Sequence, residues 1–470
     1  MRSGVNEDFV PQWAKDAIFY QIFPERFANG DPSNDPPGVQ PWGGKPLPDN
    51  YFGGDLQGII DHLDYIADLG ANALYLNPIF ASSSNHKYHT SDYLKIDPSF
   101  GTNGLFGKLV EACHRKGIRI VLDGVFNHTG TDHWAFQDII KNGEKSKYLD
   151  WYNIYSFPVS SSPRNPNYEC WANLGRLPKL MVQNPDVKAY LFEATKYWTS
   201  MGIDGWRLDV PNEIPHEFWV EWRSLVKSEN KDCYIVGEIW GEATPWLQGE
   251  QFDAVMNYEF RRACLAFFCR GAISPQEFDA SLAYTRSLYP PQVNYVLQNL
   301  VGSHDTERFL TLCQREVWKV KLAALFQMTY IGAPMVYYGD EIGMEGGNDP
   351  DCRRTMIWEE TKWNRELRDF FKRVIQIRNQ SKALRRGDFV SLVADENGKV
   401  YIFKRELDSE QAYIILNRGA ESISVEFPVK DSSHPLVDAL TGERMTSRGG
   451  KVACEAPARS GKIIMTPTAN

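Results

Sequence analysis

The sequence lacks any long uninterrupted run of apolar residues. Its most apolar stretch, from Leu322 to Tyr338, is broken by four polar or helix-interrupting residues, whereas a membrane-spanning helix needs about 20 apolar residues. The first residues, Met1 to Ala14, contain acidic side chains and a proline but no apolar core of signal-peptide length. We therefore expect no membrane partner and a cytoplasmic location. Removal of a leader before this start is the alternative.

Excess positive charge and cysteine are also scarce. The chain has 51 Lys and Arg against 60 Asp and Glu, a net charge of −9. Because nucleic-acid binding needs a basic surface, we expect no nucleic-acid partner. Eight cysteines in 470 residues, with no CxxC pair, are interpreted mostly as free buried thiols, with Cys113 and Cys264 in apolar helical contexts. A disulfide framework or a zinc cluster is the minor alternative.

Aromatic residues are plentiful, with 14 Trp, 22 Tyr and 25 Phe. They can fill a large core, and some can serve as flat apolar platforms for sugar rings. Composition alone does not choose between these two roles.

Short apolar runs alternate with amphipathic stretches as far as residue 384. The expected strands span residues 17–27, 73–76, 118–126, 203–210, 234–240, 254–258, 300–304 and 335–338. Continuous rather than alternating apolar strands indicate burial on both faces, as in a parallel sheet. Eight strand–helix units, of which the fifth helix is poorly defined, predict an α/β fold, a (β/α)₈ TIM barrel.

Two segments depart from this alternation. About sixty residues rich in Pro, Asn, Ser and aromatics separate the third strand from the next helix, too many for a simple loop, so we expect an inserted subdomain. After residue 384, short alternating strands predict a C-terminal antiparallel β-sandwich. The expected domains are the first part of the barrel (1–128), the inserted subdomain B (129–179), the second part of the barrel (180–384) and the C-terminal domain (385–470).

Acidic residues stand at the ends of three expected barrel strands: Asp209, Glu238 and Asp305. Active sites of such barrels form at these ends, and glycoside hydrolysis needs at least two carboxylates. Arg207 shares a strand face with Asp209 and is expected to lower its pKa, as suits a nucleophile. Apolar neighbours of Glu238 are expected to raise its pKa, as suits an acid. The alternative, solvated charges or structural ion pairs, is weakened by the convergence of three acids with two histidines and an arginine.

Several stretches resemble a known family. DGVFNH (Asp123–His128), GWRLDV (Gly205–Val210), GEIW (Gly237–Trp240) and GSHDTER (Gly302–Arg308) are similar to the four motifs of the α-amylase family of glycoside hydrolases. LPKL (Leu177–Leu180) resembles a fifth motif of its neopullulanase, cyclomaltodextrinase and maltogenic amylase subfamily. YGDEIGMEGGNDPDCRR (Tyr338–Arg354) and FDAVMNYEF (Phe252–Phe260) resemble that subfamily too. The resemblance extends from about residue 14 to the C-terminus.

The resemblance implies a role for each matching residue. Asp209 matches the nucleophile, Glu238 the general acid/base and Asp305 the third acid, which holds hydroxyls of the distorted sugar. The matching substrate-binding positions are Tyr88, His128, Arg207, Glu213, Trp240 and His304. Two positions depart from the subfamily: His89 replaces the usual Asp, and Gly241 the usual His.

The implied reaction is retaining hydrolysis of α-1,4-glucosidic bonds in cyclodextrins, pullulan, starch and malto-oligosaccharides, with maltose release, some transglycosylation and no catalytic cofactor. Two alternatives remain. The first is another enzyme of the family, such as an α-glucosidase or a glucosyl isomerase. The second is a non-catalytic, amylase-like glycan-binding scaffold, which the presence of all three acids disfavours.

The loop FANGDPSNDPP offers closely spaced oxygen donors, which suit Ca²⁺. A polar turn is the alternative, and spacing alone favours it. The resemblance implies a structural Ca²⁺ at Asn29, Asp31, Asn34, Asp35, Gly53 and Asp55.

Subfamily relatives usually carry an N-terminal β-domain that commonly builds a dimer and narrows the active-site mouth. Because the first expected strand begins near residue 17, we expect that domain to be lacking. We accordingly expect a monomer, or a dimer of another geometry, that hydrolyses starch relatively well beside cyclodextrins.

Overall fold

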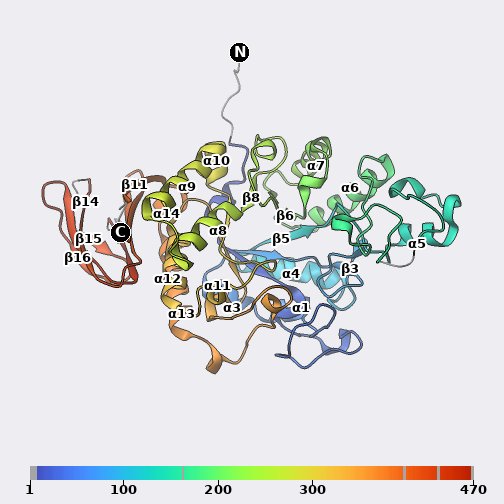
Figure 1. The fold of residues 1–470 in the computed structure, drawn as a ribbon, viewed down its shortest axis with the longest axis horizontal. Coiled ribbons are helices and arrows are strands. Elements are labelled where there is room, and N and C mark those ends of the chain that lie inside the picture. The colour runs from blue at the N-terminus through green and yellow to red at the C-terminus, as the bar shows by residue number, and fades with distance from the viewer. Residues whose placement is uncertain (1–7, 161–163, 395–397, 431–434, 467–470) are drawn as a thin grey trace, which may run out of the picture.

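The computed structural model describes residues 8–160, 164–394, 398–430 and 435–466. Within these ranges, eight parallel strands close into a barrel in the order β1-β10-β9-β8-β7-β6-β5-β2 (Figure 1). Its strands are β1 (Phe19–Ile22), β2 (Ala73–Leu76), β5 (Arg119–Gly124), β6 (Gly205–Leu208), β7 (Tyr234–Gly237), β8 (Ala254–Asn257), β9 (Gln298–Leu300) and β10 (Ala333–Tyr337). Apart from Arg119 every strand residue is buried, which confirms the parallel sheet expected from continuous apolar runs.

Helices follow the strands around the barrel. They are α1 (Pro24–Phe27), α2 (Leu56–Asp61), α3 (Leu63–Leu69), α4 (Asn103–Arg115), α5 (Trp134–Asn142), α6 (Pro185–Ser200), α7 (His216–Glu229), α8 (Tyr258–Cys264), α9 (Pro275–Leu288), α10 (Pro291–Asn294), α11 (Phe309–Leu312), α12 (Val317–Thr329), α13 (Arg365–Gln380) and α14 (Lys382–Arg386). Polar N-caps start several of them: Thr102 begins α4, Asn184 begins α6 and Asn364 begins α13. Between β7 and β8 lies only a 3₁₀ turn, Thr244–Trp246, which explains why the fifth helix is poorly defined in the sequence.

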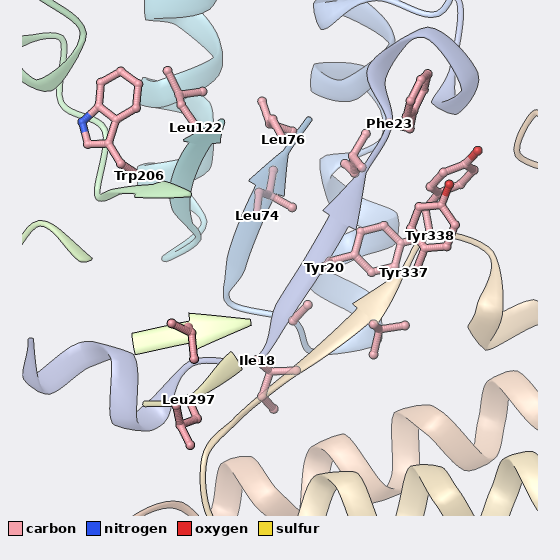
Figure 2. Packing of buried hydrophobic residues seen from close by; sticks show 14 of the residues in the cluster. Ile18, Tyr20, Phe23, Leu74, Leu76, Leu122, Trp206, Leu297, Tyr337 and Tyr338 are labelled. Atoms are coloured by element: carbon pink, nitrogen blue, oxygen red, sulfur yellow. The ribbon is translucent and has the colours of Figure 1, made fainter. Parts of the chain in front are cut away.

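Alternate side chains of most barrel strands enter two separate apolar clusters. In β1, Tyr20 and Ile22 point outward against the helices, whereas Phe19 points into the barrel. Figure 2 shows part of the outer cluster, where Tyr20, Leu74 and Trp206 fill the space beside the strands. This two-sided packing fixes the strand ends that carry the candidate site.

The segment between β5 and β6 leaves the barrel and returns to the same place. His128 and Lys179 form an isolated antiparallel bridge, and Tyr152 pairs with Leu180. The segment contains α5 and short 3₁₀ turns, and it projects from one side of the barrel (Figure 1). A second excursion, the hairpin β3 (Phe80–Ser82) and β4 (Thr90–Ile96), follows β2.

The C-terminal strands form two antiparallel layers. Among the described residues, six strands pair in the order β11-β12-β13-β18-β15-β16, and β14 pairs with β17. Their bounds are β11 (Asp388–Ala394), β12 (Val400–Leu407), β13 (Glu410–Asn417), β14 (Ile423–Pro428), β15 (Leu436–Asp438), β16 (Arg444–Met445), β17 (Lys451–Ala456) and β18 (Ser460–Met465). Apolar residues of both layers, including Ile415 and Phe427, share one core. The expected C-terminal antiparallel domain is present.

Two of the eight cysteines, Cys269 and Cys313, form a disulfide. The other six are free, all of them within the described ranges, and Cys113 and Cys264 are buried as expected. No helix in the described part of the chain is long and apolar enough to cross a membrane.

Candidate active site

The candidate site is centred on Arg207, the third residue of β6. Its guanidinium is fully buried, and its Nη1 lies 2.8 Å from Asp209 Oδ1 and 2.9 Å from Asp123 Oδ1. Its Nη2 lies 3.0 Å from Glu238 Oε2. Three carboxylates from the ends of β5, β6 and β7 therefore meet around one cation.

Glu238 has a polar environment, contrary to the apolar one expected from its sequence neighbours. Besides Arg207, its carboxylate accepts hydrogen bonds from Trp240 Nε1 at 3.1 Å and from the Val210 backbone N–H at 3.2 Å. Val210 has left-handed φ/ψ angles of 35° and 49°, which are unfavourable for a β-branched residue. This strained backbone directs an N–H toward the expected acid.

Burial governs the protonation of the acids. Burial raises the pKa of Asp209 well above its usual value; Arg207 opposes this shift, while the charges of Glu238 and Asp123 add to it. Burial likewise raises the pKa of Asp123 to about 6. Arg207 lowers the pKa of Asp209 as expected, but loss of solvent and two neighbouring carboxylates outweigh one guanidinium, so the net shift is upward.

Tyr88 and His304 form a second cluster beside the acids. The Tyr88 hydroxyl donates to Asp123 Oδ2 at 2.9 Å and lies 2.7 Å from His304 Nε2. Their rings are parallel, with centroids 5.6 Å apart. Burial lowers the pKa of His304 well below its usual value and that of His128 to about 3, so both imidazoles are neutral at pH 7 and can hydrogen-bond sugar hydroxyls.

The strand expected at residues 300–304 ends at Leu300. His304 and Asp305 lie instead on the following loop, where the Ser303 N–H donates to Thr306 Oγ1 at 3.0 Å and forms a turn. Arg353 Nη2 lies 3.2 Å from Asp305 Oδ1 and fixes that carboxylate.

A hollow of about 530 Å³ collects most of the expected site residues. Those that line it are Tyr88, His128, Asp209, Glu238, Trp240, His304 and Asp305. Arg207 lies beneath its floor. Glu213 is not among the lining residues and instead pairs with Lys179, whose Nζ lies 3.1 Å from its Oε2. The exposed Trp240 ring stacks on Tyr258 with centroids 3.8 Å apart, which leaves a flat aromatic surface at the edge.

Several residues of the site were not singled out from the sequence. Asp123 connects Arg207, Tyr88 and Tyr75, and the Tyr75 hydroxyl donates to its Oδ2 at 2.7 Å. Its position at the end of a buried strand was the available signal. Arg353 lies in the NDPDCRR stretch, but no spacing rule connects it to Asp305.

The polar loop after α1 gathers around Asp55. This carboxylate accepts four N–H groups, from Gly30, Asp31, Asn34 and Gly58, at 2.7–3.1 Å, so it organises the loop rather than offering free oxygens. The Asn29 side chain donates to Asp35 Oδ1 at 2.8 Å.

Two oxygens in this loop are well suited to a cation. The side-chain oxygens of Asn29 and Asn34 are buried and accept no hydrogen bond within the described structure. Gly53 has a φ of +83°, and a Cβ there would lie 2.2 Å from Asp35 Oδ1, so the backbone approaches that carboxylate closely. Asp31 is partly exposed and caps a 3₁₀ turn through Ser33.

Comparison with known proteins assigns the chain to a family. The family described as "Alpha amylase, catalytic domain" matches residues 21–387. The chain is 51% identical to neopullulanase 2 of Thermoactinomyces vulgaris over 459 residues, 97% of this chain and 78% of that protein. It is 50% identical to a cyclomaltodextrinase of Geobacillus thermopakistaniensis over 95% of this chain and 76% of that protein.

Solved structures agree. A cyclic α-maltosyl-(1→6)-maltose hydrolase from Arthrobacter globiformis superposes with a TM-score of 0.90 at 42% identity, covering 97% of this chain and all of that one. A cyclomaltodextrinase superposes with a TM-score of 0.92 at 45% identity, covering 97% of this chain and 79% of that one. With the matching catalytic-domain family and the acids gathered around Arg207, the chain belongs to the α-amylase family and is a glycoside hydrolase.

Proposed function

We propose that the protein hydrolyses α-1,4-glucosidic bonds of cyclodextrins, pullulan, starch and malto-oligosaccharides with retention of the anomeric configuration. The observation that carries this proposal is the contact of Asp209 and Glu238 with the two terminal nitrogens of one guanidinium. In retaining hydrolysis one of two neighbouring carboxyl groups attacks the sugar while the other protonates the leaving oxygen, and the shared guanidinium makes these two groups neighbours.

In the first step Glu238 protonates the leaving glycosidic oxygen while Asp209 attacks the anomeric carbon. The Arg207 guanidinium acts to lower the pKa of Asp209, which favours the ionised form that a nucleophile needs. Glu238, now a base, then activates water to release the sugar. A sugar hydroxyl in place of water gives transglycosylation.

Polar groups beside the two acids hold the sugar at the reacting centre. His304 and His128 offer imidazole nitrogens, and Asp305, fixed by Arg353, accepts from sugar hydroxyls. Tyr88 supplies a ring at the same place, and Trp240 supplies a platform at the edge of the hollow.

Proton NMR during the first minutes of hydrolysis tests the proposed chemistry: α-maltose must appear before mutarotation. Parallel rates on β-cyclodextrin, pullulan, soluble starch, maltotriose and sucrose separate this activity from that of an α-glucosidase or a glucosyl isomerase. Cyclic α-maltosyl-(1→6)-maltose belongs in the same panel, since the structurally similar Arthrobacter protein is named for its hydrolysis. β-Maltose as first product, or no glucan cleavage, would contradict the proposal.

We also propose that the polar loop holds a structural Ca²⁺. The support is the pair of buried, unpaired oxygens of Asn29 and Asn34, together with the Asp35 carboxylate and the close backbone at Gly53. Such an ion would tie the loop to the start of α2 and takes no part in bond cleavage. Elemental analysis of the purified protein tests its presence.

A further inference from the structure

A loop of the inserted segment, residues 171–177, forms one side of the hollow's rim. Its ends are joined because the Trp171 N–H donates to the Leu177 carbonyl at 3.0 Å, and Leu174 N–H donates to the Trp171 carbonyl at 2.8 Å. The Trp171 ring stacks on His128 with centroids 5.7 Å apart. The insert loop is thereby fixed to His128 in the wall of the 530 Å³ hollow, here called the catalytic hollow. Leu174 and Arg176 are exposed at the tip of the loop.

A barrel loop, residues 45–50, forms the facing side. Asn50 closes it, accepting from the Leu47 N–H at 2.9 Å and donating to the Lys45 carbonyl at 3.0 Å. Asn85 donates to the Pro48 carbonyl at 3.0 Å. The barrel loop is therefore also held in place, and Leu47 stands half exposed on the rim.

The two loops meet in one ion pair. Arg176 Nη1 lies 3.5 Å from Asp49 Oδ1, and both side chains line the catalytic hollow while remaining 59% and 84% exposed. An exposed pair of this kind contributes little to stability and is weakened by salt. The contact between the loops can therefore open at little energetic cost.

A second hollow of about 480 Å³, the outer hollow, lies on the other side of the insert loop. Four residues line both hollows and so form the wall between them: His89, Leu174, Arg176 and Leu177. Arg164, Asn173 and Gly175 complete the outer hollow. In the outer hollow, the Arg164 guanidinium and the Asn173 amide can donate to sugar hydroxyls, and Leu174 offers an apolar edge to a sugar ring.

We propose that the outer hollow binds glucosyl units of long or branched α-glucans that extend past the catalytic hollow, and that the Arg176–Asp49 pair is the gate between the two. This inference rests on the proposed glucan hydrolysis. With the pair formed, the wall is continuous and short substrates are contained. With the pair broken, the Arg176 side chain, which lines both hollows, can turn away from the wall, and a longer chain can cross it.

The test compares kcat/KM on soluble starch with kcat/KM on maltotriose. Arg176→Ala is expected to raise the starch-to-maltotriose ratio about tenfold, the discrimination of a single pocket contact. Asp49→Asn is expected to raise it in the same direction, and high salt to do so only in the wild type. The matched control is Arg315→Ala, which removes an exposed arginine that pairs with Glu345 away from both hollows and should leave the ratio unchanged.

Two further variants separate a gate from a general loosening of the rim. Asp49→Arg combined with Arg176→Asp restores an ion pair with reversed charges and should return the ratio to that of the wild type. Asn173→Trp, added to Arg176→Ala, fills the outer hollow and should abolish the gain on starch while maltotriose turnover persists.

An unchanged ratio in Arg176→Ala, with maltotriose still hydrolysed, overturns the gate but not the glucan hydrolysis. A raised ratio that Asn173→Trp does not reverse overturns binding in the outer hollow. Absence of activity on every glucan in the wild type would instead refute the proposed function itself.

Discussion

At Arg207 one guanidinium contacts three carboxylates, so the substitution of any one of them changes the field on the others. Asp209, Asp123 and Glu238 repel one another at this centre, and burial prevents water from screening them. A substitution that removes one of these charges can therefore lower activity and raise stability at the same time.

Asp209→Asn is expected to lower kcat by at least about 10⁴-fold, as loss of a nucleophile does. The same variant should melt at a higher temperature than the wild type at pH 7.5. Because the folded-state pKa of Asp209 is raised, its stability contribution is complete below the unfolded value of about 3.9 and is lost as pH rises through the folded value. Asparagine never ionises and avoids that loss.

Scanning calorimetry of both proteins at pH 4 and pH 7.5 tests this. The advantage of the variant should be large at pH 7.5 and small at pH 4. A variant less stable than the wild type at pH 7.5 would show that the ion pair with Arg207 outweighs the repulsion.

The pH dependence of kcat/KM should reflect the buried acids. Burial raises the pKa of Asp123 to about 6, and its protonation weakens the ion pair that orients Arg207 toward Asp209. On maltotriose, which carries no charge, we expect the acidic limb to fall near pH 6. A limb near pH 4 would indicate that these carboxyls titrate as if exposed to solvent.

At the scale of single helices and strands, the features set by local sequence signals were the most readily predicted. The start of α9 follows from Pro275 after Ser274, and the structure adds a full capping box with Glu277. The sequence pattern of residues 57–69 predicts one helix ending before Gly70, but the structure divides it at His62, whose φ/ψ angles are not helical. His62 packs against Trp358 with ring centroids 3.8 Å apart. Because the two residues lie far apart in the sequence, local periodicity cannot predict this contact.

In the candidate site, too, locally encoded features were predictable and long-range contacts were not. Strand ends and motifs were sufficient to predict Asp209, Glu238 and Asp305, because barrel topology brings such ends together. The polar surroundings of Glu238 and the salt bridge from Arg353 to Asp305 were not predictable, since they depend on side-chain directions and on a loop distant in sequence.

The polar loop leads to a prediction at this scale. Calcium should raise the melting temperature, because a ligand bound only by the native state stabilises it by mass action. Gly53→Ala should lower the melting temperature and abolish the calcium response, since a Cβ there collides with Asp35. Melting curves in EDTA and in millimolar calcium measure both effects, and curves that coincide in the wild type would exclude the ion.

At the scale of the whole molecule, the barrel helices and the C-terminal sheet share one core. Phe326 of α12 packs edge-on against Phe403 of β12. The buried Arg405 guanidinium donates to the carbonyls of Thr329 and Gly387 at 2.8 Å. A separate unfolding of either part would break these contacts and expose the apolar surface that the two parts bury together.

We therefore expect a single thermal transition for barrel and C-terminal sheet together. Arg405→Met should destabilise the whole protein by roughly 3 kcal/mol, the range for breaking a buried polar network. Calorimetry and near-UV circular dichroism should give coincident curves. Two resolved transitions in the wild type would indicate that the shared core does not couple the two parts.

The carboxylates around Arg207 also define what kind of inhibitor the site will accept. Asp123, Asp209 and Glu238 outnumber the single guanidinium among them. When they are ionised, the pocket therefore has a net negative charge and favours a positively charged ligand. The oxocarbenium-like transition state supplies one for an instant. A sugar ring with a protonated nitrogen in place of its oxygen supplies one permanently, and it should therefore bind more tightly than its neutral parent sugar. Inhibition constants for such a pair, compared at pH 5 and pH 7, should diverge as the acids ionise, and equal constants at pH 7 would argue against a net negative site.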